Sequence, residues 1–438
     1  MNQPPKAKLL PLSAQVNDRD HLVLGGCDVT ELLAEFGSPL YVYDEDTLRG
    51  MAEAFTSAFC GRYADSQVIY GSKAFINVGM ARLLAGYGLG FDVVSGGEVA
   101  VLRAAGVPPD RVYFHGNNKS APELSEALAW GIGRVVIDSF EELEVLDGLA
   151  AASGRRQQVL IRVSPGIDPH THRHTTTGVL DSKFGIPIST GQAQAAVRQT
   201  LAMPHLELLG LHFHLGSPIF ELAPFEQATR LVLEFASRMR EEGLSLQELS
   251  PGGGFAIAYT EADDPPAPDA YAEAIVGALQ ERCRDLDMPE PTLVVEPGRA
   301  MVGRAGVALY TVGTIKEVPG VRTFVAVDGG MGDNIRPALY DAKYDALVAT
   351  RATQDPSETV TIAGKYCESG DILVRDVTLA PVQPGDVLAV PASGAYAPAM
   401  ASTYNLNRRP AIILVGGGQA RLLRRRDSYE DLMRTDVL

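Results

Sequence analysis

Residues 67–74 read QVIYGSKA, an apolar run from Val68 to Tyr70 followed by small residues and a single lysine, Lys73. A lysine at the exit of a buried strand usually lays its stem along apolar surface and extends its ammonium group into water. A partly desolvated lysine is instead a nucleophile that forms a Schiff base with a carbonyl, because burial lowers the pKa of its amine. The stretch alone leaves both interpretations open.

Eight apolar strand candidates follow one another from this stretch onward. They begin at Val68, Phe91, Val112, Val135, Val159, Leu206, Leu246 and Thr292. Alanine- and leucine-rich stretches such as 78–87 and 123–130 lie between them and indicate helices. Regular alternation of strand and helix predicts a parallel sheet, and eight units fit a closed (β/α)₈ TIM barrel, here over residues 46–304. An open doubly wound sheet is the competitor, but its usual G-x-G-x-x-G is missing after the first strand.

A different pattern begins at about Ala305, where short alternating strands are separated by turn residues. These segments include VALYTVGTIKEV, RTFVAVDGG, ETVTIAGKY, DILVRDVTL, GDVLAVP and PAIILVGGG. They predict a second, all-β domain resembling a β-sandwich or β-barrel, formed by residues 1–45 and 305–438 and joined by the N-terminal strand-like piece 39–43. The acidic, proline-rich stretch 263–269, DDPPAPD, is expected to be a surface loop.

The composition excludes several classes of partner and site. The formal net charge is −16, so nucleic acid and anionic membranes are poor partners, and the basic run 421–426, RLLRRR, is expected to be a solvated face. The four cysteines are widely spaced without a CxxC, which indicates neither a disulfide framework nor a zinc site. The N-terminus has no apolar signal region and no run is long enough to span a bilayer, so we expect a cytoplasmic protein.

Polar and glycine residues gather at the predicted C-terminal ends of the barrel strands, where this fold places its chemistry. SPGGGF, 250–255, would let backbone N–H groups approach a phosphate, although a glycine run often only turns the chain. Glu296 in EPGR ends an apolar strand, and its simplest partner is its own neighbour Arg299. A lysine, a phosphate cradle and a fixed carboxylate together suit pyridoxal phosphate, for its aldehyde, phosphate and pyridine nitrogen respectively.

The histidines need separate treatment because they could indicate a metal. PHTHRH, 169–174, lacks the helical spacing of a zinc motif and has no cysteine or carboxylate set nearby, so we expect a mobile loop over the site and no metal. Of His212 and His214, alternation is expected to turn only one toward the barrel interior. The other would be a packing histidine.

Ten motifs occur in order across nearly the whole chain: YGSKAF, FDVVSGGE, FHGNNKS, the THxxxTTG…SKFG segment, HFHLGS, PGGGF, EPGR, DNxRPALY, YCESGD and GAY…MAS.YN. In this order they resemble the bacterial diaminopimelate decarboxylases, in the alanine-racemase-like fold group of pyridoxal phosphate enzymes. The resemblance implies pyridoxal 5′-phosphate-dependent decarboxylation of meso-2,6-diaminopimelate to L-lysine and CO₂, the last step of lysine biosynthesis. Departures such as YGSKAF for YAxKAN, MASTYN for MASNYN and Ala397 for a frequent glycine remove no charged or nucleophilic group.

The resemblance also implies roles for individual residues. Lys73 would form the Schiff base with the cofactor and Cys367 would be the proton donor. The implied cofactor-binding residues are Lys73, Asp92, His214, Ser217, Gly254, Glu296, Gly298, Arg299 and Tyr396. The implied substrate-binding residues are Arg299, Arg336, Tyr340, Glu368 and Tyr396. In this family the segment with Cys367 and Glu368 reaches the partner's site, so a homodimer with shared active sites is implied.

Three alternatives remain open. A racemase on the same fold typically has arginine facing the ring nitrogen, whereas Glu296 favours decarboxylation. A decarboxylase of another basic amino acid, such as ornithine, arginine or lysine, would differ at the distal end of the substrate, where Arg336 and Glu368 together suit the amino-carboxylate of diaminopimelate. A non-catalytic pyridoxal phosphate carrier is essentially a barrel alone, and the β domain with Cys367 and Tyr396 speaks against it.

Overall fold

The structure is a computed structural model that describes residues 3–168 and 181–437. The chain divides into two compact units. The barrel unit comprises residues 52–256 and 265–298, and the β-rich unit comprises residues 1–51, 257–264 and 299–438. The PHTHRH segment lies outside the described residues. The division used for the sequence, 46–304 against 1–45 with 305–438, stays a prediction.

Eight parallel strands form a closed ring in the barrel unit, which confirms the predicted TIM barrel. Following the ring, they are β5 (Ser66–Gly71), β6 (Gly90–Val93), β7 (Val112–Phe114), β8 (Arg134–Ile137), β9 (Gln157–Ser164), β11 (Leu206–His212), β12 (Glu248–Gly252) and β13 (Thr292–Val295), which pairs again with β5. The short strand β10 (Ile186–Pro187) pairs with β9 outside the ring. All carboxyl ends of the ring therefore point to one rim.

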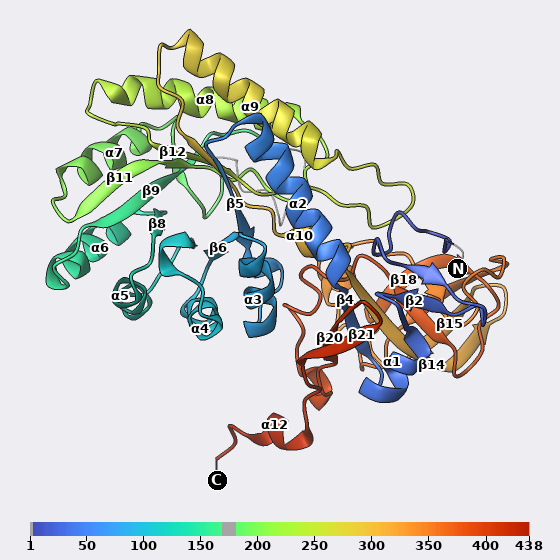
Figure 1. The fold of residues 1–438 in the computed structure, drawn as a ribbon. Helices are drawn as coiled ribbons and strands as arrows, with labels where there is room; N and C mark the ends of the chain where they lie inside the picture. Colours follow the sequence, from blue (N-terminus) through green and yellow to red (C-terminus); the bar gives the residue numbers. More distant parts are fainter. Residues whose placement is uncertain (1–2, 169–180, 438) are drawn as a thin grey trace. The chain divides into compact units, whose positions relative to one another are not determined.

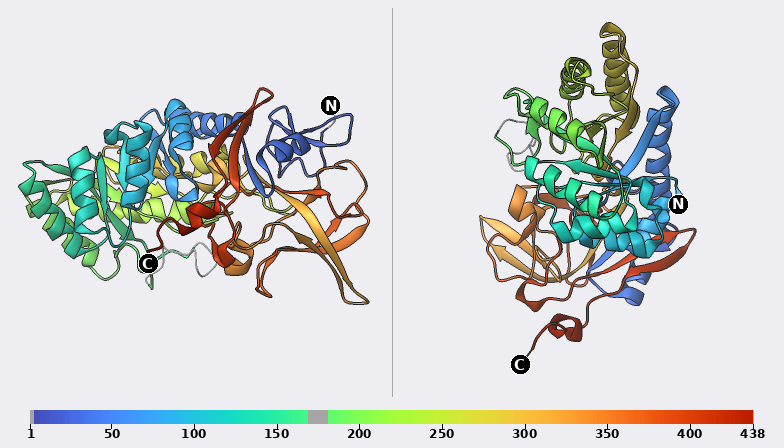
Figure 2. Two further views of the ribbon diagram at one scale, coloured as in Figure 1. Left: turned by 90° about the horizontal axis from the view of Figure 1, so that it is seen from below. Right: turned by 90° about the vertical axis from the view of Figure 1, so that its left-hand side faces the viewer.

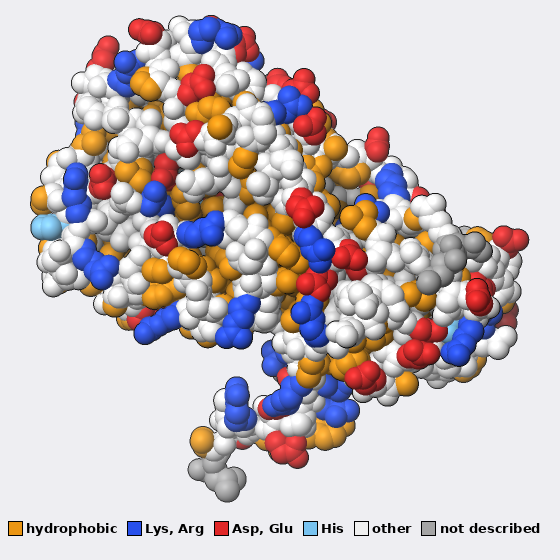
Figure 3. Space-filling model, viewed as in Figure 1, with side chains coloured by type: hydrophobic (Ala, Val, Ile, Leu, Met, Phe, Trp, Pro, Cys, Tyr) orange, Lys and Arg blue, Asp and Glu red, His pale blue; other side chains and the backbone are white. Residues whose placement is uncertain are grey.

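Helices lie outside the strand ring, as Figures 1 and 2 show. They are α3 (Val78–Gly86), α4 (Gly96–Ala105), α5 (Ala121–Trp130), α6 (Phe140–Ala152), α7 (Gln192–Ala202), α8 (Ala223–Arg240) and α9 (Pro268–Asp285), and α2 (Glu45–Arg62) leads into the barrel unit. Local sequence fixes several ends: Ser120 forms a capping box at the start of α5, and Gly131 ends it in the left-handed conformation. On the face shown in Figure 3, acidic and basic side chains are interspersed over α8 and α9.

The β-rich unit is built around a second sheet with the strand order β18-β17-β15-β14-β4-β20-β21. These strands are β18 (Ile372–Leu379), β17 (Glu358–Ala363), β15 (Arg322–Val327), β14 (Gly306–Val318), β4 (Leu40–Asp44), β20 (Ala411–Gly416) and β21 (Gln419–Arg424). Strand β19 (Val387–Val390) also pairs with β14, and β16 (Leu347–Val348) pairs with β19. Strand β4 pairs with β14 and with β20, so the N-terminal segment joins this sheet as predicted. Its apolar face contributes Leu40 and Val42 to the core of the unit.

Small elements complete the β-rich unit. They are β1 (Gln15–Val16), β2 (Leu22–Leu24), β3 (Cys27–Asp28), α1 (Val29–Phe36), α10 (Arg299–Val302), α11 (Arg336–Tyr340) and α12 (Tyr429–Met433). The basic run is part of strand β21, which the sequence analysis did not predict. Arg421 and Arg425 are exposed and pair with Glu45 and Asp431, whereas Arg424 and Arg426 are partly buried, so the expectation of a solvated face holds for only two of the four arginines. The DDPPAPD stretch is a loop through Ala267, and α9 begins at Pro268.

Candidate functional site

Lys73 lies two residues beyond the end of β5, in the short 3₁₀ helix Ser72–Ala74. Its Nζ is 3.5 Å from Oδ2 of Asp92, which stands in the neighbouring strand β6. The Asp92 side chain is fully buried, whereas that of Lys73 is 41% exposed. Burial raises the pKa of the Asp92 carboxyl, although the Lys73 ammonium opposes this effect. The amine is therefore partly exposed and lies beside a buried carboxylate at the rim.

Glu296 follows β13 and is the centre of a buried hydrogen-bonded group in the barrel unit. Its Oε1 accepts a hydrogen bond from the Ser250 hydroxyl at 2.8 Å, and its Oε2 lies 3.3 Å from Nε2 of His212. Nε2 of His115, which follows β7, is 3.4 Å from Oε1. Burial alone would raise the pKa of the Glu296 carboxyl, but the His212 and His115 imidazoles outweigh it and hold that pKa well below its usual range. Glu296 is thus a buried carboxylate that is ionised at neutral pH.

The two histidines beside Glu296 are packed against each other. The ring centroids of His115 and His212 are 4.8 Å apart with the rings at 70°, and burial holds the pKa of His115 well below its usual range. Among the described residues, His115 Nε2 and His212 Nδ1 accept or donate no hydrogen bond that satisfies normal geometry. The ligand atoms of His115, His212 and Glu296 all lie within 4.8 Å of one another, so the group could also receive a metal ion. The absence of a metal stays a prediction.

The expectation that only one of His212 and His214 faces the site is wrong. Residues two apart in an extended chain point to the same side. His212 contacts Glu296, and Nδ1 of His214 accepts a hydrogen bond from the backbone N–H of Gly253 at 3.2 Å. Burial, followed by the charges of Lys73 and Arg162, holds the pKa of His214 well below its usual range, so its ring is neutral at pH 7.

The glycine run after β12 leaves room where any side chain would collide. A Cβ on Gly253 would lie 2.3 Å from the Glu296 carbonyl oxygen, and one on Gly254 would lie 2.4 Å from that of Gly216. Gly254 also has φ of +106°, a conformation that favours glycine. Gly298 packs equally closely, because a Cβ there would be 3.0 Å from the Gly71 carbonyl oxygen. Bare backbone therefore lines this part of the rim, as a phosphate-binding loop requires.

The predicted substrate-binding arginines belong to the β-rich unit, where tyrosines surround them. Nη1 of Arg299 donates to the Tyr259 hydroxyl, and the Arg299 guanidinium lies 4.8 Å from the ring centroid of Tyr396. The guanidinium of Arg336 lies 4.9 Å from the Tyr259 ring and donates to the hydroxyl of Tyr344. Burial would raise the pKa of Tyr259, but the two guanidinium groups outweigh it and lower that pKa. Two buried cations held by neutral rings can bind an anionic group.

Cys367 and Glu368 lie in an exposed loop of the β-rich unit. Tyr340 is the last residue of α11 in the same unit. The backbone N–H of Cys367 donates to Oδ1 of Asn405 at 3.1 Å. The Tyr404 hydroxyl donates to the Glu368 carboxylate, and this bond raises the pKa of Tyr404. The loop thus presents a thiol and a carboxylate next to each other.

Sequence analysis missed five residues of these groups as site residues: His115, His212, Ser250, Tyr259 and Tyr344. For the first three a signal existed. His115 is the second residue of FHGNNKS, His212 opens HFHLGS and Ser250 opens SPGGGF. All three lie in or directly after the last residues of barrel strands, at the same rim as Glu296. Tyr259 and Tyr344 lie in irregular segments far apart in the chain, and no local pattern marks them.

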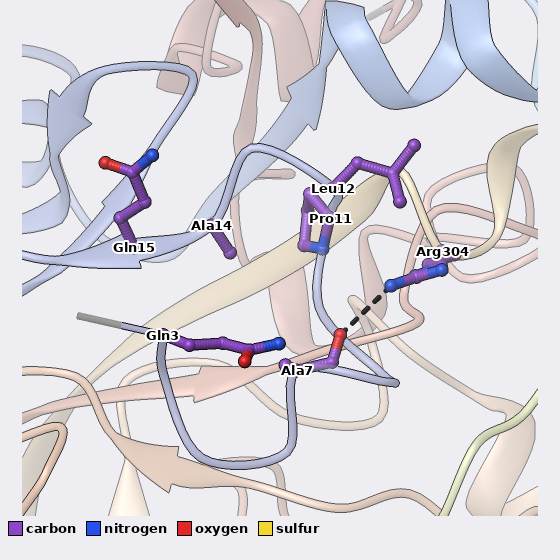
Figure 4. Close-up of a pocket in the computed structure, with 7 residues that line it drawn as sticks. All are labelled: Gln3, Ala7, Pro11, Leu12, Ala14, Gln15 and Arg304. Carbon is purple, nitrogen blue, oxygen red and sulfur yellow. Dashed lines mark hydrogen bonds between the residues drawn. The ribbon is translucent and has the colours of Figure 1, made fainter. Parts of the chain in front are cut away.

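A pocket of about 360 Å³ lies elsewhere in the β-rich unit and is shown in Figure 4. Its residues are Gln3, Ala7, Pro11, Leu12, Ala14, Gln15 and Arg304. The Arg304 guanidinium donates to the backbone oxygens of Leu10 at 2.8 Å and Ala7 at 3.0 Å. These bonds fix the N-terminal segment, and we assign the pocket no part in a reaction.

Comparisons with known proteins identify the family. A family model described as "Pyridoxal-dependent decarboxylase, pyridoxal binding domain" matches residues 47–303. The diaminopimelate decarboxylase of Bacillus subtilis (strain 168) is 46% identical over 97% of both chains, and that of Synechocystis sp. is 45% identical over 99% of this chain and 94% of the relative. The crystal structure of the M. jannaschii diaminopimelate decarboxylase in complex with L-lysine has a TM-score of 0.92 at 34% identity and covers 98% of each chain.

Among the described residues, no helix is both long and apolar enough to cross a membrane. The fold, the rim with Lys73 and Glu296, and the near full-length similarity agree with one another. The chain belongs to the diaminopimelate decarboxylase family of pyridoxal-dependent decarboxylases.

Proposed function

We propose that the protein decarboxylates meso-2,6-diaminopimelate to L-lysine and CO₂ with pyridoxal 5′-phosphate as its cofactor, the last step of lysine biosynthesis. The observation that carries the proposal is the 46% identity to a diaminopimelate decarboxylase over 97% of both chains. The crystal structure of one relative holds L-lysine, which is the expected product. A decarboxylase of ornithine, arginine or lysine is the alternative.

The residues of the barrel unit fit this cofactor. A carboxylate that is buried and ionised needs a positive partner, and a protonated ring nitrogen can be one. The tight glycine backbone at 252–254 suits a phosphate, and Lys73 offers an amine at the same rim. We propose that Lys73 holds the aldehyde, Glu296 the ring nitrogen and His214 the ring face. The further cofactor contacts that we propose are Asp92, Ser217, Gly254, Gly298, Arg299 and Tyr396.

Decarboxylation breaks the bond between Cα and its carboxylate and later forms a C–H bond at the same carbon. Bound pyridoxal phosphate supplies an electron sink for the pair that is left behind when CO₂ departs. Glu296 supports this chemistry because a carboxylate that stays ionised favours a proton on the ring nitrogen beside it. His212 and His115 keep Glu296 ionised, and the Ser250 hydroxyl holds its Oε1 in place.

The β-rich unit supplies the groups that we assign to the substrate. Arg299 and Arg336 carry positive charge for carboxylate groups, and the Glu368 carboxylate suits an ammonium group at the distal end. Tyr340 and Tyr396 complete the proposed substrate-binding set. We propose that the Cys367 thiol donates the proton to Cα, after which Lys73 releases the product. The rim of a neighbouring subunit receives Cys367 and Glu368 in the homodimer that we propose.

The location that we propose is the cytoplasm. Supporting it, the four cysteines Cys27, Cys60, Cys283 and Cys367 are all free thiols in the structure. Free thiols are typical of a reducing compartment.

The decisive experiment supplies meso-diaminopimelate, ornithine, arginine and lysine separately to purified holoenzyme and measures CO₂. We expect release from meso-diaminopimelate, with L-lysine in equal amount. Release from ornithine or arginine only would overturn the proposed substrate.

The control is Lys73→Ala, in the same assay and in an absorption spectrum. We expect no CO₂ and no visible band of bound cofactor after purification. A variant that keeps this band would show that another amine holds the cofactor.

A further inference from the structure

Two of the ten motifs contain a buried acid to which the proposed chemistry gives no role. Asp333 opens DNIRPALY, which also carries Arg336, and Asp371 ends YCESGD, which carries Cys367 and Glu368. The side chains of Asp333 and Asp371 belong to residues only 2% and 3% exposed. A buried carboxylate is costly unless hydrogen bonds satisfy it, so the partners of these two groups show what they do.

Asp371 connects the two motifs through a single carboxylate. Its Oδ1 accepts a hydrogen bond from the backbone N–H of Met331 at 2.6 Å, and its Oδ2 accepts one from the backbone N–H of Tyr366 at 2.8 Å. Met331 precedes the DNIRPALY motif by two residues, and Tyr366 is the residue before Cys367. Burial raises the pKa of the Asp371 carboxyl, and the two backbone hydrogen bonds oppose that rise. Together they hold two separate segments to one side chain.

The backbone reinforces the same connection. The N–H of Lys365 donates to the carbonyl oxygen of Gly329 at 3.0 Å, and the N–H of Asp371 donates to that of Glu368 at 3.1 Å. Segment 329–334 and loop 364–371 are therefore tied at two places, at the start of the loop and through the Asp371 side chain.

Asp333 closes the turn that leads into Arg336. Its Oδ2 accepts a hydrogen bond from the backbone N–H of Gly330 at 3.0 Å, and its carbonyl oxygen accepts one from the Tyr41 hydroxyl at 2.9 Å. The N–H of Arg336 in turn donates to Oδ1 of Asn334 at 3.3 Å. The turn thus has a fixed shape immediately before the arginine.

Glycines make room for the Asp371 carboxylate. A Cβ on Gly330 would lie 2.6 Å from Oδ1, and a Cβ on Gly364 would lie 2.2 Å from Oδ2. The carboxylate therefore fills space that two glycines leave open, one in each connected segment. A longer acid would not fit there without moving the backbone.

We propose that Asp371 is a positioning residue that clamps the segment leading to Arg336 onto the loop with Cys367 and Glu368. Asp333 fixes the turn on the Arg336 side of the clamp. In the proposed homodimer Cys367 and Glu368 enter the partner's site, so the clamp holds the substrate cation Arg336 and the thiol loop of one chain in fixed positions for two neighbouring sites. This inference rests on the proposed function for the roles of Arg336, Glu368 and Cys367, whereas the clamp itself follows from the contacts.

Asp371→Asn tests the clamp because it keeps the size of the side chain and exchanges one acceptor oxygen for an NH₂ donor. One of the two backbone amides, of Met331 or of Tyr366, then loses its acceptor. Hydrogen–deuterium exchange of peptides covering 329–336 and 364–371 should become about tenfold faster or more, with barrel peptides unchanged. The matched control is Asp355→Asn, the same exchange at an exposed aspartate, which should behave as the wild type.

Kinetics separate positioning from general stability. The clamp predicts that Asp371→Asn raises KM for meso-diaminopimelate, through Arg336, and lowers kcat, through Cys367, at temperatures where the protein is folded. The absorption band of the bound cofactor should not change. A loss of active protein alone would lower the apparent kcat at constant KM and would recover on cooling, and this result would overturn the proposal.

The remaining outcomes also decide the matter. Unchanged exchange in both peptides overturns the clamp, and faster exchange with unchanged kinetics shows that it has no part in positioning. If wild-type enzyme does not decarboxylate meso-diaminopimelate, the proposed function fails, while the exchange measurement still decides the clamp. Should Asp371→Asn not fold, Asp371→Ser, which keeps one short acceptor, is measured in the same way.

Discussion

Glu296 shows how single residues set the chemistry of the barrel rim. A buried carboxylate tends to take up a proton, because burial penalises its charged form. Here the His212 and His115 imidazoles beside its oxygens reverse that tendency, and the Ser250 hydroxyl holds one oxygen in place by a hydrogen bond. The negative charge of Glu296 thus depends on its neighbours, and a substitution can remove it without changing the size of the side chain.

Glu296→Gln is the first prediction at this scale. We expect kcat to fall by about a hundredfold or more, because a neutral amide no longer favours a proton on the ring nitrogen beside it. Ser250→Ala serves as the graded comparison, since it removes one of the contacts and leaves the carboxylate in place. The measurements are steady-state CO₂ release and the absorption spectrum of the bound cofactor. Equal losses in both variants would contradict a special role for the charge.

Secondary-structure elements explain which site residues the sequence could predict. Lys73, Asp92 and Glu296 follow or end neighbouring parallel strands, and the carboxyl ends of parallel strands share one rim, so the sequence order placed them together. Each strand was visible as an apolar run. Tyr259 was not predictable, because it lies in an irregular segment whose path no periodic pattern describes, although its partners Arg299 and Arg336 begin the short helices α10 and α11.

Two errors have clear physical reasons at this scale. The first error is the expectation that only one of His212 and His214 faces the barrel interior. Side chains alternate along a strand, so positions two apart share a face. Strand β21 does not stand out in the sequence because RLLRRR is basic, whereas residues 421–424 belong to an edge strand that among the described residues pairs only with β20. Charged side chains are common on edge strands because they discourage further pairing.

Gly254→Ala tests the glycine backbone after β12. The substitution would place a Cβ 2.4 Å from the Gly216 carbonyl oxygen at φ of +106°, so the loop must shift. We expect the affinity of apoenzyme for pyridoxal phosphate to fall about tenfold or more, as measured by absorbance titration.

The matched control for that loop is Gly277→Ala in the middle of α9. No heavy atom lies within 4 Å of the Cβ that it would add. We expect unchanged cofactor affinity and a gain of about 0.5–1 kcal/mol in the free energy of unfolding, because alanine favours a helix over glycine. Equal affinities in both alanine variants would show that the 252–254 backbone does not bind the phosphate.

At the scale of the whole molecule, Asp333 links stability to pH. Burial raises the pKa of the Asp333 carboxyl to about 7, well above the ordinary value of an aspartate. The folded protein therefore keeps a proton that the unfolded chain has released. The raised pKa of Asp333 therefore contributes to the free energy of unfolding at about pH 4, and this contribution is lost progressively as pH rises to about 7.

Asp333→Asn removes the loss of stability with rising pH, because an amide does not titrate. It keeps an oxygen that can accept the hydrogen bond from the Gly330 N–H. We expect the variant and the wild type to unfold alike at pH 4, and the variant to be more stable by about 1–3 kcal/mol at pH 8. Urea unfolding of both proteins at several pH values measures the difference between their free energies of unfolding. Taking this difference cancels the contributions of the other titrating groups, which the two proteins share. A difference that is constant across this range would contradict the raised pKa.

The proposed homodimer gives a prediction that no single chain can satisfy. If Lys73 and Cys367 of one site come from different subunits, Lys73→Ala and Cys367→Ala are each inactive as pure dimers. Random mixing makes half of the dimers mixed, and each of these has one site with both residues intact. The mixture should therefore recover about a quarter of the wild-type activity. Mixing Lys73→Ala with the double variant Lys73→Ala/Cys367→Ala is the control and should recover none. If mixed dimers form, as shown by differently tagged chains purifying together, and no activity returns, each site is built within one chain.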